Sequence, residues 1–192
     1  MKPSQLASIL DSELRASAET NHTPVMIWGP PGVGKSQLVR AASERRGVSI
    51  IDLRLSQVEP TDLRGIPNRE EDRVKWAPPE LLPEAGRHGP KGILFLDEIT
   101  AAVPSVYAAA YQQIMDRRLG EYHVPPEWVI FAAGNRQGDR GISYTMPSPL
   151  ANRFMHFELL PDIDDWVNWA YSAGISNHVI GFLRFKPERL FD

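Results

Sequence analysis

The chain has 192 residues, enough for one good core and a small appended subdomain but too few for two full domains. Its net charge of −3, with both signs mixed throughout, provides no overall basic field for nucleic acid or an anionic membrane. It contains no cysteine, which excludes disulfides and thiolate metal sites, and it shows no leader-like or membrane-length apolar run, so we expect a cytoplasmic protein.

The first predicted elements are a helix and a strand. Residues 3–18 place leucine and isoleucine at spacings of three and four, which predicts an amphipathic helix. The apolar run 25–28 predicts a short strand. The histidines that follow along the chain do not have metal-ligand spacing, so we expect them to be surface or packing residues.

Residues 29–36, GPPGVGKS, match G-x-x-x-x-G-K-[ST] at every fixed position. Glycines let such a loop turn tightly and point its N–H groups at phosphate oxygens. Lys35 then reaches the β- and γ-phosphates, and the Ser36 hydroxyl is a ligand for Mg²⁺. A helix is predicted over 37–45, which completes a strand, loop, helix order. The expected nucleotide-binding residues are Gly29, Pro30, Pro31, Gly32, Val33, Gly34, Lys35, Ser36 and Gln37.

A second strand is predicted over 49–53, followed by a polar, proline-rich stretch over 56–91. This stretch predicts loops and short helices that project from the sheet, where function is often found. Within it, residues 62–65 match D-x-x-G, a weak indication of a GTP-binding switch or a small-molecule kinase. No base-reading N-K-x-D motif follows, which weakens both alternatives.

The next strand, 92–96, is followed directly by Asp97 and Glu98. A buried strand places such a pair at its carboxyl edge, where phosphoryl-transfer sites need an acidic metal-holding group and a base. We predict that Asp97 holds Mg²⁺ together with Ser36, and that Glu98 orients and deprotonates the attacking water. Water attack makes hydrolysis, and not transfer to a metabolite, the expected reaction.

Three more elements follow in the same rhythm. A helix with proline in its first turn is predicted over 104–118, with Tyr107, Ala110, Tyr111, Ile114 and Arg118 on one face. Strands are predicted over 128–133 and 154–160. Strands that alternate with helices indicate an α/β fold, here a five-stranded parallel sheet flanked by helices.

In this order of motifs the chain resembles an AAA+ ATPase, and more narrowly the MoxR-type branch. The resemblance covers residues 23–185 and implies a P-loop NTPase core that uses ATP and Mg²⁺. Residues 131–135, FAAGN, are similar to the family's sensor 1, which implies that Asn135 helps to place the attacking water. The stretch 119–127 stands where the family has a hairpin before sensor 1, and 56–91 stands where MoxR-type proteins carry an insertion.

Residues 147–154, PSPLANRF, resemble the family segment whose arginine enters the neighbouring subunit's nucleotide site. The resemblance implies that Arg153 is this finger, because a guanidinium delivered in trans stabilises charge on the γ-phosphoryl group. Arg136 and Arg140 are further candidates for the same interface, equally consistent with solvated loop charges. The predicted catalytic residues are Lys35, Glu98, Asn135 and Arg153.

After Pro161, Asp164 is predicted to cap one helix that stops at Gly174, and Ser176 a second helix that ends near Phe185. Residues 1–160 are thus expected to form the nucleotide-binding core and 161–192 the beginning of an all-helical lid. Neither Arg184 nor Arg189 stands in a recognisable sensor 2 motif, so we expect the lid to be cut short.

The function that the resemblance implies is ATP hydrolysis that drives remodelling of a protein partner by a hexameric ring. Proteins of this branch often act on partners with a von Willebrand factor A domain, which the residues themselves do not show. Arg64, Gly65, Ile66, Pro67 and Trp76 are expected either to contact a partner or the centre of the ring, or to pack on the sheet edge. A nucleic-acid motor or loader on the same core is the alternative, although no basic stripe supports it.

Overall fold

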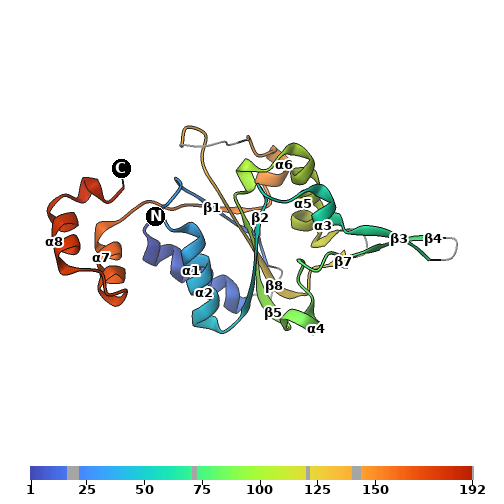
Figure 1. The fold of residues 1–192 in the computed structure, drawn as a ribbon, viewed down its shortest axis with the longest axis horizontal. Coiled ribbons are helices and arrows are strands. Elements are labelled where there is room, and N and C mark those ends of the chain that lie inside the picture. Colours follow the sequence, from blue (N-terminus) through green and yellow to red (C-terminus); the bar gives the residue numbers. More distant parts are fainter. Residues whose placement is uncertain (17–21, 71–72, 120–121, 140–143, 192) are drawn as a thin grey trace.

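The computed structural model describes residues 1–16, 22–70, 73–119, 122–139 and 144–191. Its centre is a five-stranded sheet in the order β2-β5-β8-β1-β9, and every neighbouring pair is parallel (Figure 1). The strands are β1 (Val25–Trp28), β2 (Ser49–Arg54), β5 (Lys91–Asp97), β8 (Glu127–Gly134) and β9 (Met155–Glu158). The predicted α/β class and its five parallel strands are confirmed, and β9 is shorter than the predicted run.

Helices cover both faces of this sheet (Figure 1). They are α1 (Pro3–Ala16) and α2 (Lys35–Arg46) on one face, and α3 (Pro60–Arg64), α5 (Pro104–Asp116) and α6 (Ser148–Ala151) on the other. Side chains alternate between the faces: Val25 and Ile27 pack in the cluster that includes α1, whereas Met26 packs in the cluster that includes α5. Burial on both faces explains why the strands read as continuous apolar runs.

Helix α5 ends two residues earlier than predicted. Arg117 has φ 52°, a left-handed conformation that breaks the helix, and its guanidinium donates to the carbonyl oxygens of Pro125 (2.9 Å) and Trp128 (2.6 Å). Arg118 therefore lies on β6 (Arg118–Leu119) and not on the helix face, which corrects the prediction. Strand β6 pairs with β7 (Tyr122–His123) in a short antiparallel ladder, within the stretch expected to hold a hairpin.

The stretch 56–91 holds a feature that the sequence prediction missed. Besides α3 and α4 (Ala85–His88), it forms an antiparallel hairpin of β3 (Ile66–Glu70) and β4 (Arg73–Ala77), which projects from the body (Figure 1). At its root Gly65 has φ +82°, and a Cβ there would lie 2.0 Å from the carbonyl oxygen of Ala77. Only glycine fits this position, because both the backbone conformation and the space exclude a side chain.

At the opposite end of the molecule, α7 (Ile163–Ser172), α8 (Asn177–Phe185) and the 3₁₀ turn η2 (Pro187–Arg189) follow the sheet. Their small core contains Val167, Ala170 and Ile180. Asp162, and not the predicted Asp164, caps α7: its Oδ1 accepts from the Asp165 N–H at 3.0 Å. The Ser176 hydroxyl oxygen accepts from the His178 N–H at 3.4 Å, so the predicted cap of α8 is confirmed.

The residues described by the structure include no helix with both the length and the apolar character needed to cross a membrane.

Candidate functional site

The P-loop connects the carboxyl end of β1 to the first turn of α2. Gly32 and Gly34 have φ +82° and +98°, left-handed conformations that let the chain turn back above the helix. A Cβ on Gly29 would lie 2.9 Å from the carbonyl oxygen of Leu159, so this glycine permits close packing against the chain after β9. The loop thereby places backbone N–H groups at the N-terminus of α2, a geometry that favours anion binding.

The Lys35 ammonium is held inside this loop. It donates to the carbonyl oxygens of Gly29 (2.6 Å) and Pro30 (3.0 Å) and to Oδ1 of Asn135 (3.0 Å), and the residue is only 9% exposed. Burial lowers the pKa of Lys35, while the negative charge of Asp97 acts in the opposite direction. A bound phosphate would give this buried ammonium an anionic partner.

Ser36 and Asp97 are brought together as predicted for a metal pair. The Ser36 hydroxyl donates to Oδ2 of Asp97 at 2.7 Å, although 61 residues separate them in the chain. Asp97 ends β5 and is 7% exposed. No cluster of three or more His, Cys, Asp or Glu side chains with metal-binding potential occurs among the described residues. A hydroxyl and one carboxylate fit Mg²⁺, which prefers oxygen ligands and completes its shell with water and nucleotide phosphates.

Glu98 follows in a strained conformation, with φ 55° and ψ 32°, at the start of the 3₁₀ turn η1 (Ile99–Ala101). Its backbone N–H donates to Oδ1 of Asp97 at 2.8 Å, and its carboxylate accepts from the Ser56 hydroxyl. A left-handed non-glycine residue at a site is a reason to look for function. The sequence prediction missed Ser56, but its place just after β2, at the carboxyl edge of the sheet, could have indicated it.

Asn135 directly follows β8 and contacts the P-loop. Its side chain accepts from Lys35, and its backbone N–H donates to the hydroxyl oxygen of Thr100 at 3.0 Å. Thr100 is 1% exposed and was also missed. A Cβ on Gly134 would lie 2.6 Å from Cγ2 of Thr100, so the glycine lets the turn after β5 pack against the end of β8. This packing fixes where Asn135 points.

Arg153 lies apart from this group. It follows α6 in a turn, its backbone N–H donates to the carbonyl oxygen of Leu150 at 3.0 Å, and the residue is exposed. Within the described part of the chain, its guanidinium forms no hydrogen bond or ion pair. Arg136 differs, because it pairs with Glu158 and lies 3.5 Å from Oδ2 of Asp139. Arg140 lies outside the described residues.

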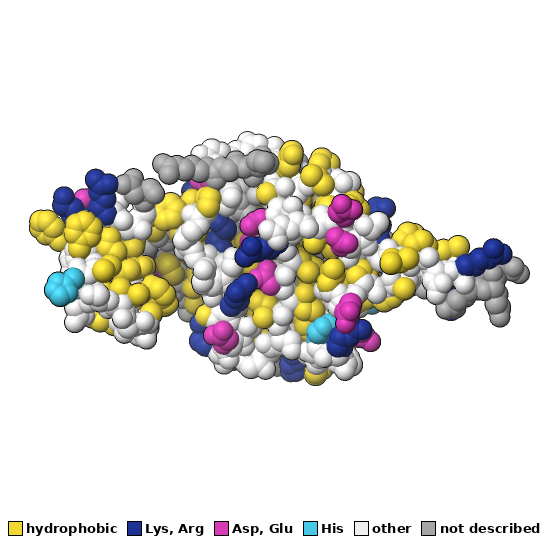
Figure 2. Space-filling model, viewed as in Figure 1, with side chains coloured by type: hydrophobic (Ala, Val, Ile, Leu, Met, Phe, Trp, Pro, Cys, Tyr) yellow, Lys and Arg dark blue, Asp and Glu magenta, His cyan; other side chains and the backbone are white. Residues whose placement is uncertain are grey.

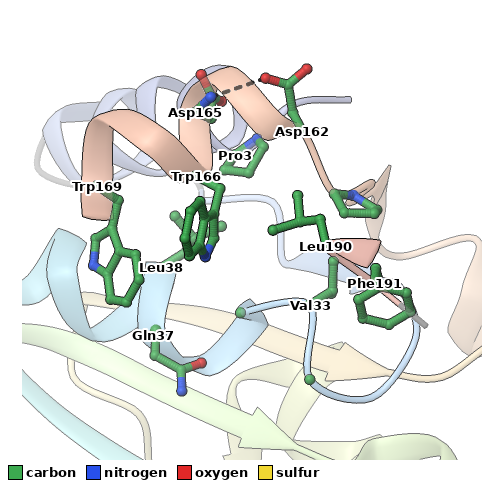
Figure 3. A pocket seen from close by; sticks show the side chains of 13 residues that line it. Pro3, Val33, Gln37, Leu38, Asp162, Asp165, Trp166, Trp169, Leu190 and Phe191 are labelled. Carbon is green, nitrogen blue, oxygen red and sulfur yellow. Dashed lines mark hydrogen bonds between the residues drawn. The ribbon is translucent and has the colours of Figure 1, made fainter. Parts of the chain in front are cut away.

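A cavity of about 360 Å³, the P-loop pocket, opens beside the loop (Figure 3). Trp166 and Trp169 of α7 stand over α2, and Leu190 and Phe191 close the side nearer Val33 (Figure 3). Its lining comprises Pro3, Gly32, Val33, Gly34, Gln37, Leu38, Pro161, Asp162, Asp165, Trp166, Trp169, Leu190 and Phe191.

Helix α1 holds α7 in place at this pocket. The Ser4 N–H donates to Oδ2 of Asp165 at 2.7 Å, and the Lys2 ammonium lies 2.9 Å from Oδ2 of Asp162. The hydrogen bond from Lys2 lowers the pKa of Asp162. One wall of the pocket is therefore tied to the N-terminal helix.

The chain matches a known protein family over the residues that form this site. A family model described as AAA domain (dynein-related subfamily) matches residues 24–154, which contain the P-loop, Asp97, Asn135 and Arg153. Midasin from Giardia intestinalis is 28% identical over 178 residues, an alignment that covers 87% of this chain and 4% of that protein. The ATPase family gene 2 protein homolog B from Rattus norvegicus is 36% identical over 80 residues, covering 42% of this chain and 10% of that protein. The chain thus spans a small part of these relatives.

Solved structures share the fold at low sequence identity. A protein from Cytophaga hutchinsonii described as an ATPase superposes with a TM-score of 0.61 at 16% identity, covering 90% of this chain and 51% of that one. The RuvB Holliday junction branch migration motor of Thermotoga maritima gives a TM-score of 0.55 at 20% identity, covering 89% of this chain and 50% of that one. These likenesses concern the fold alone.

Proposed function

Because this chain belongs to the dynein-related subfamily of AAA domains, we propose that it binds ATP with Mg²⁺ and hydrolyses it between subunits of a ring. One observation supports this most strongly: Lys35, Ser36, Asp97 and Asn135 meet through hydrogen bonds, although up to 100 residues separate them. An ammonium, a hydroxyl, a carboxylate and an amide at a P-loop are the groups that phosphoryl transfer requires.

We assign each side chain a role at the transferred phosphate. Lys35 moves from its carbonyl partners to the β- and γ-phosphates, and Ser36 and Asp97 hold Mg²⁺. When bound, Mg²⁺ would neutralise part of the negative charge of the phosphates. Glu98 accepts the proton of the attacking water, while the Ser56 hydroxyl fixes its carboxylate. Asn135, held by Thr100, orients that water.

The P-loop pocket is the proposed place of the nucleoside. Its volume of about 360 Å³ lies at the lower end of the range for small-ligand sites. The indole rings of Trp166 and Trp169 offer apolar walls for a base, and Gln37 adds an amide at the helix (Figure 3). Residues 161–192 act in this proposal as a lid over the nucleotide.

Arg153 is proposed to serve the site of a neighbouring copy. The residue is exposed, and among the described residues its guanidinium has no hydrogen-bond or ion-pair partner. A charge delivered in trans at the γ-phosphoryl group makes hydrolysis depend on assembly. We propose a homo-oligomeric ring, hexameric as in the MoxR-type branch.

We propose that the motor acts on a protein. On the projecting hairpin, Ile66, Val74 and Trp76 are 72%, 62% and 43% exposed, an apolar surface that suits protein contact (Figure 2). Arg64 and Pro67 accompany it at the root of the hairpin. By likeness to the MoxR-type branch, the partner is a substrate or adaptor such as a von Willebrand factor A domain protein.

The test is ATP hydrolysis by the purified chain over a range of protein concentrations. Lys35→Ala should abolish ATP binding, and specific activity of the unaltered chain should rise with concentration. Lys91→Ala is the matched control, because that lysine is 54% exposed and paired with Glu127 away from the P-loop. Hydrolysis that survives Lys35→Ala would overturn the assignment. Strong stimulation by DNA would favour a nucleic-acid motor instead.

A further inference from the structure

A three-residue link joins the strand that enters the P-loop to the turn that carries Arg153. Trp28 is the last residue of β1 and immediately precedes Gly29. Its indole N–H donates to Nδ1 of His156 on β9 at 2.8 Å. Nε2 of the same imidazole lies 2.7 Å from the carbonyl oxygen of Ala151, the last residue of α6.

The two contacts fix the chemical state of the imidazole. The indole can only donate, so Nδ1 of His156 must accept and carries no proton. Nε2 then carries the proton and donates it to Ala151. The imidazole and indole planes are 15° apart, which is compatible with an in-plane hydrogen bond. His156 is thus a neutral bridge with one donor and one acceptor, both in use.

The carbonyl at the end of this bridge is part of the arginine's own turn. Ala151 also accepts from the Phe154 N–H at 3.1 Å, which closes a turn around residues 152 and 153. Helix α6 has only four residues, so only a few backbone bonds hold this turn. The imidazole supplies a fixed point between this turn and the sheet.

We propose that His156 is a positioning residue for Arg153, and that Trp28, His156 and Ala151 pass movement at a subunit's own P-loop to the arginine it lends. The proposal rests on the trans role proposed for Arg153. Backbone bonds tie the Trp28 end of the link to the site: the Gly29 N–H donates to the carbonyl oxygen of Gly134 at 3.3 Å, and the Leu159 N–H donates to that of Trp28 at 2.8 Å. A shift of the P-loop therefore reaches Trp28 directly.

Mixed rings separate this role from a general structural one. An Arg153→Ala chain keeps its own site but lends no arginine, whereas a Glu98→Gln chain lends arginine but does not hydrolyse. A mixture should therefore turn over only where a Glu98→Gln subunit serves an Arg153→Ala neighbour. His156→Leu is then placed in one chain or the other, and turnover is measured against ATP concentration.

We expect His156→Leu in the Glu98→Gln chain to lower kcat by between about 10- and 100-fold without changing KM, because a misplaced group loses rate and not binding. In the Arg153→Ala chain the same change should leave turnover intact. His156→Gln should restore most of the rate, since its amide can accept from Trp28 and donate to Ala151. Trp28→Phe in the lending chain should act like His156→Leu, and the two should not add.

The outcomes distinguish the two proposals. An inactive mixture, with an active unaltered chain, would overturn the trans role of Arg153 and this proposal with it. An active mixture in which His156→Leu costs the same in either chain, or nothing in the lending chain, would overturn the role of His156 alone. Thermal melting of each variant checks folding, and if His156→Leu does not fold, Trp28→Phe carries the same comparison.

Discussion

The two halves of the proposed catalytic site differ in how completely one chain builds them. Lys35, Ser36 and Asp97 are largely buried at the carboxyl edge of the sheet and are hydrogen-bonded to groups of their own chain. Arg153 is exposed on a turn, and its guanidinium has no partner among the residues described. The first half is preorganised by the fold, whereas the second is proposed to act on a neighbouring copy.

The difference follows from where each half sits. Parallel strands bring their carboxyl ends to one edge, so residues after β1, β5 and β8 meet without any long loop. Arg153 instead follows a four-residue helix beyond the last of these strands. Substitutions in the two halves should therefore affect different properties of the protein.

The largest expected effect comes from Arg153→Ala. Loss of an arginine finger lowers kcat by about 10³- to 10⁵-fold. ATP affinity should change little, because an arginine finger stabilises charge that develops in the transition state. Steady-state hydrolysis and binding of a fluorescent ATP analogue measure the two quantities. Arg87→Ala, 46% exposed on α4, is the control, and an equal loss in both variants would contradict the assignment.

Glu98→Gln should follow, with a loss of about 10²- to 10⁴-fold in kcat, the usual contribution of a general base. The amide retains the shape of the side chain, so ATP and Mg²⁺ should stay bound and accumulate unhydrolysed. Filter retention of labelled ATP, with thin-layer separation of the product, reports this state. Glu80→Gln serves as the control because its side chain is 89% exposed. Rapid product formation by Glu98→Gln would remove Glu98 from its role.

Acid should lower the free energy of unfolding through protonation of His22, which is hydrogen-bonded to strand β8. Its Nε2 accepts from the Ile130 N–H of β8 at 3.0 Å, and burial lowers its pKa from 6.5 to about 4. Because the folded-state pKa is the lower one, the unfolded chain binds the proton first. The stabilisation is complete above pH 6.5 and is lost as pH falls toward 4, up to about 3 kcal/mol.

Urea unfolding between pH 7 and pH 4 measures this loss. His22→Gln should flatten the dependence, since an amide oxygen accepts the same hydrogen bond without titrating. His178→Gln, at an exposed position on α8, should retain the slope of the unaltered chain. Identical slopes for the two variants would show that His22 is not the group responsible.

The smallest expected effect comes from Asp162→Ala, which removes the cap of α7 and the partner of Lys2. Loss of an N-cap destabilises the first turn of the helix. The wall of the P-loop pocket should loosen, so nucleotide affinity should fall several-fold while Arg153 still serves its neighbour. Isothermal titration with a non-hydrolysable ATP analogue measures the change. Asp164→Ala, which leaves the Asp162 cap in place, is the control.

The sequence predicts what depends on local pattern. The five buried strands are apolar runs, and the P-loop is a contiguous motif, so both are recognisable from neighbouring residues. The hairpin of β3 and β4 was missed because its strands are short and exposed, lie within a polar, proline-rich stretch, and include Pro67, a residue that argues against a strand.

Residues that depend on sheet order could not be predicted in the same way. Ser56 contacts Glu98 only because β2 lies beside β5, and Thr100 supports Asn135 only because β5 lies beside β8. Strand order is a tertiary property that no single window of sequence contains. The misplaced cap, Asp164 in place of Asp162, is an error of two residues at a helix boundary, where local pattern is least decisive.

The left-handed backbone of Glu98 also has a consequence for the history of the chain. That conformation costs a non-glycine residue about 1–2 kcal/mol, and glycine would adopt it freely. A glycine at position 98 would thus relieve this backbone strain. It would also leave the proposed site without a base for the attacking water. Under the role proposed for Glu98, selection for folding alone would favour glycine at this position, whereas selection for turnover would favour glutamate.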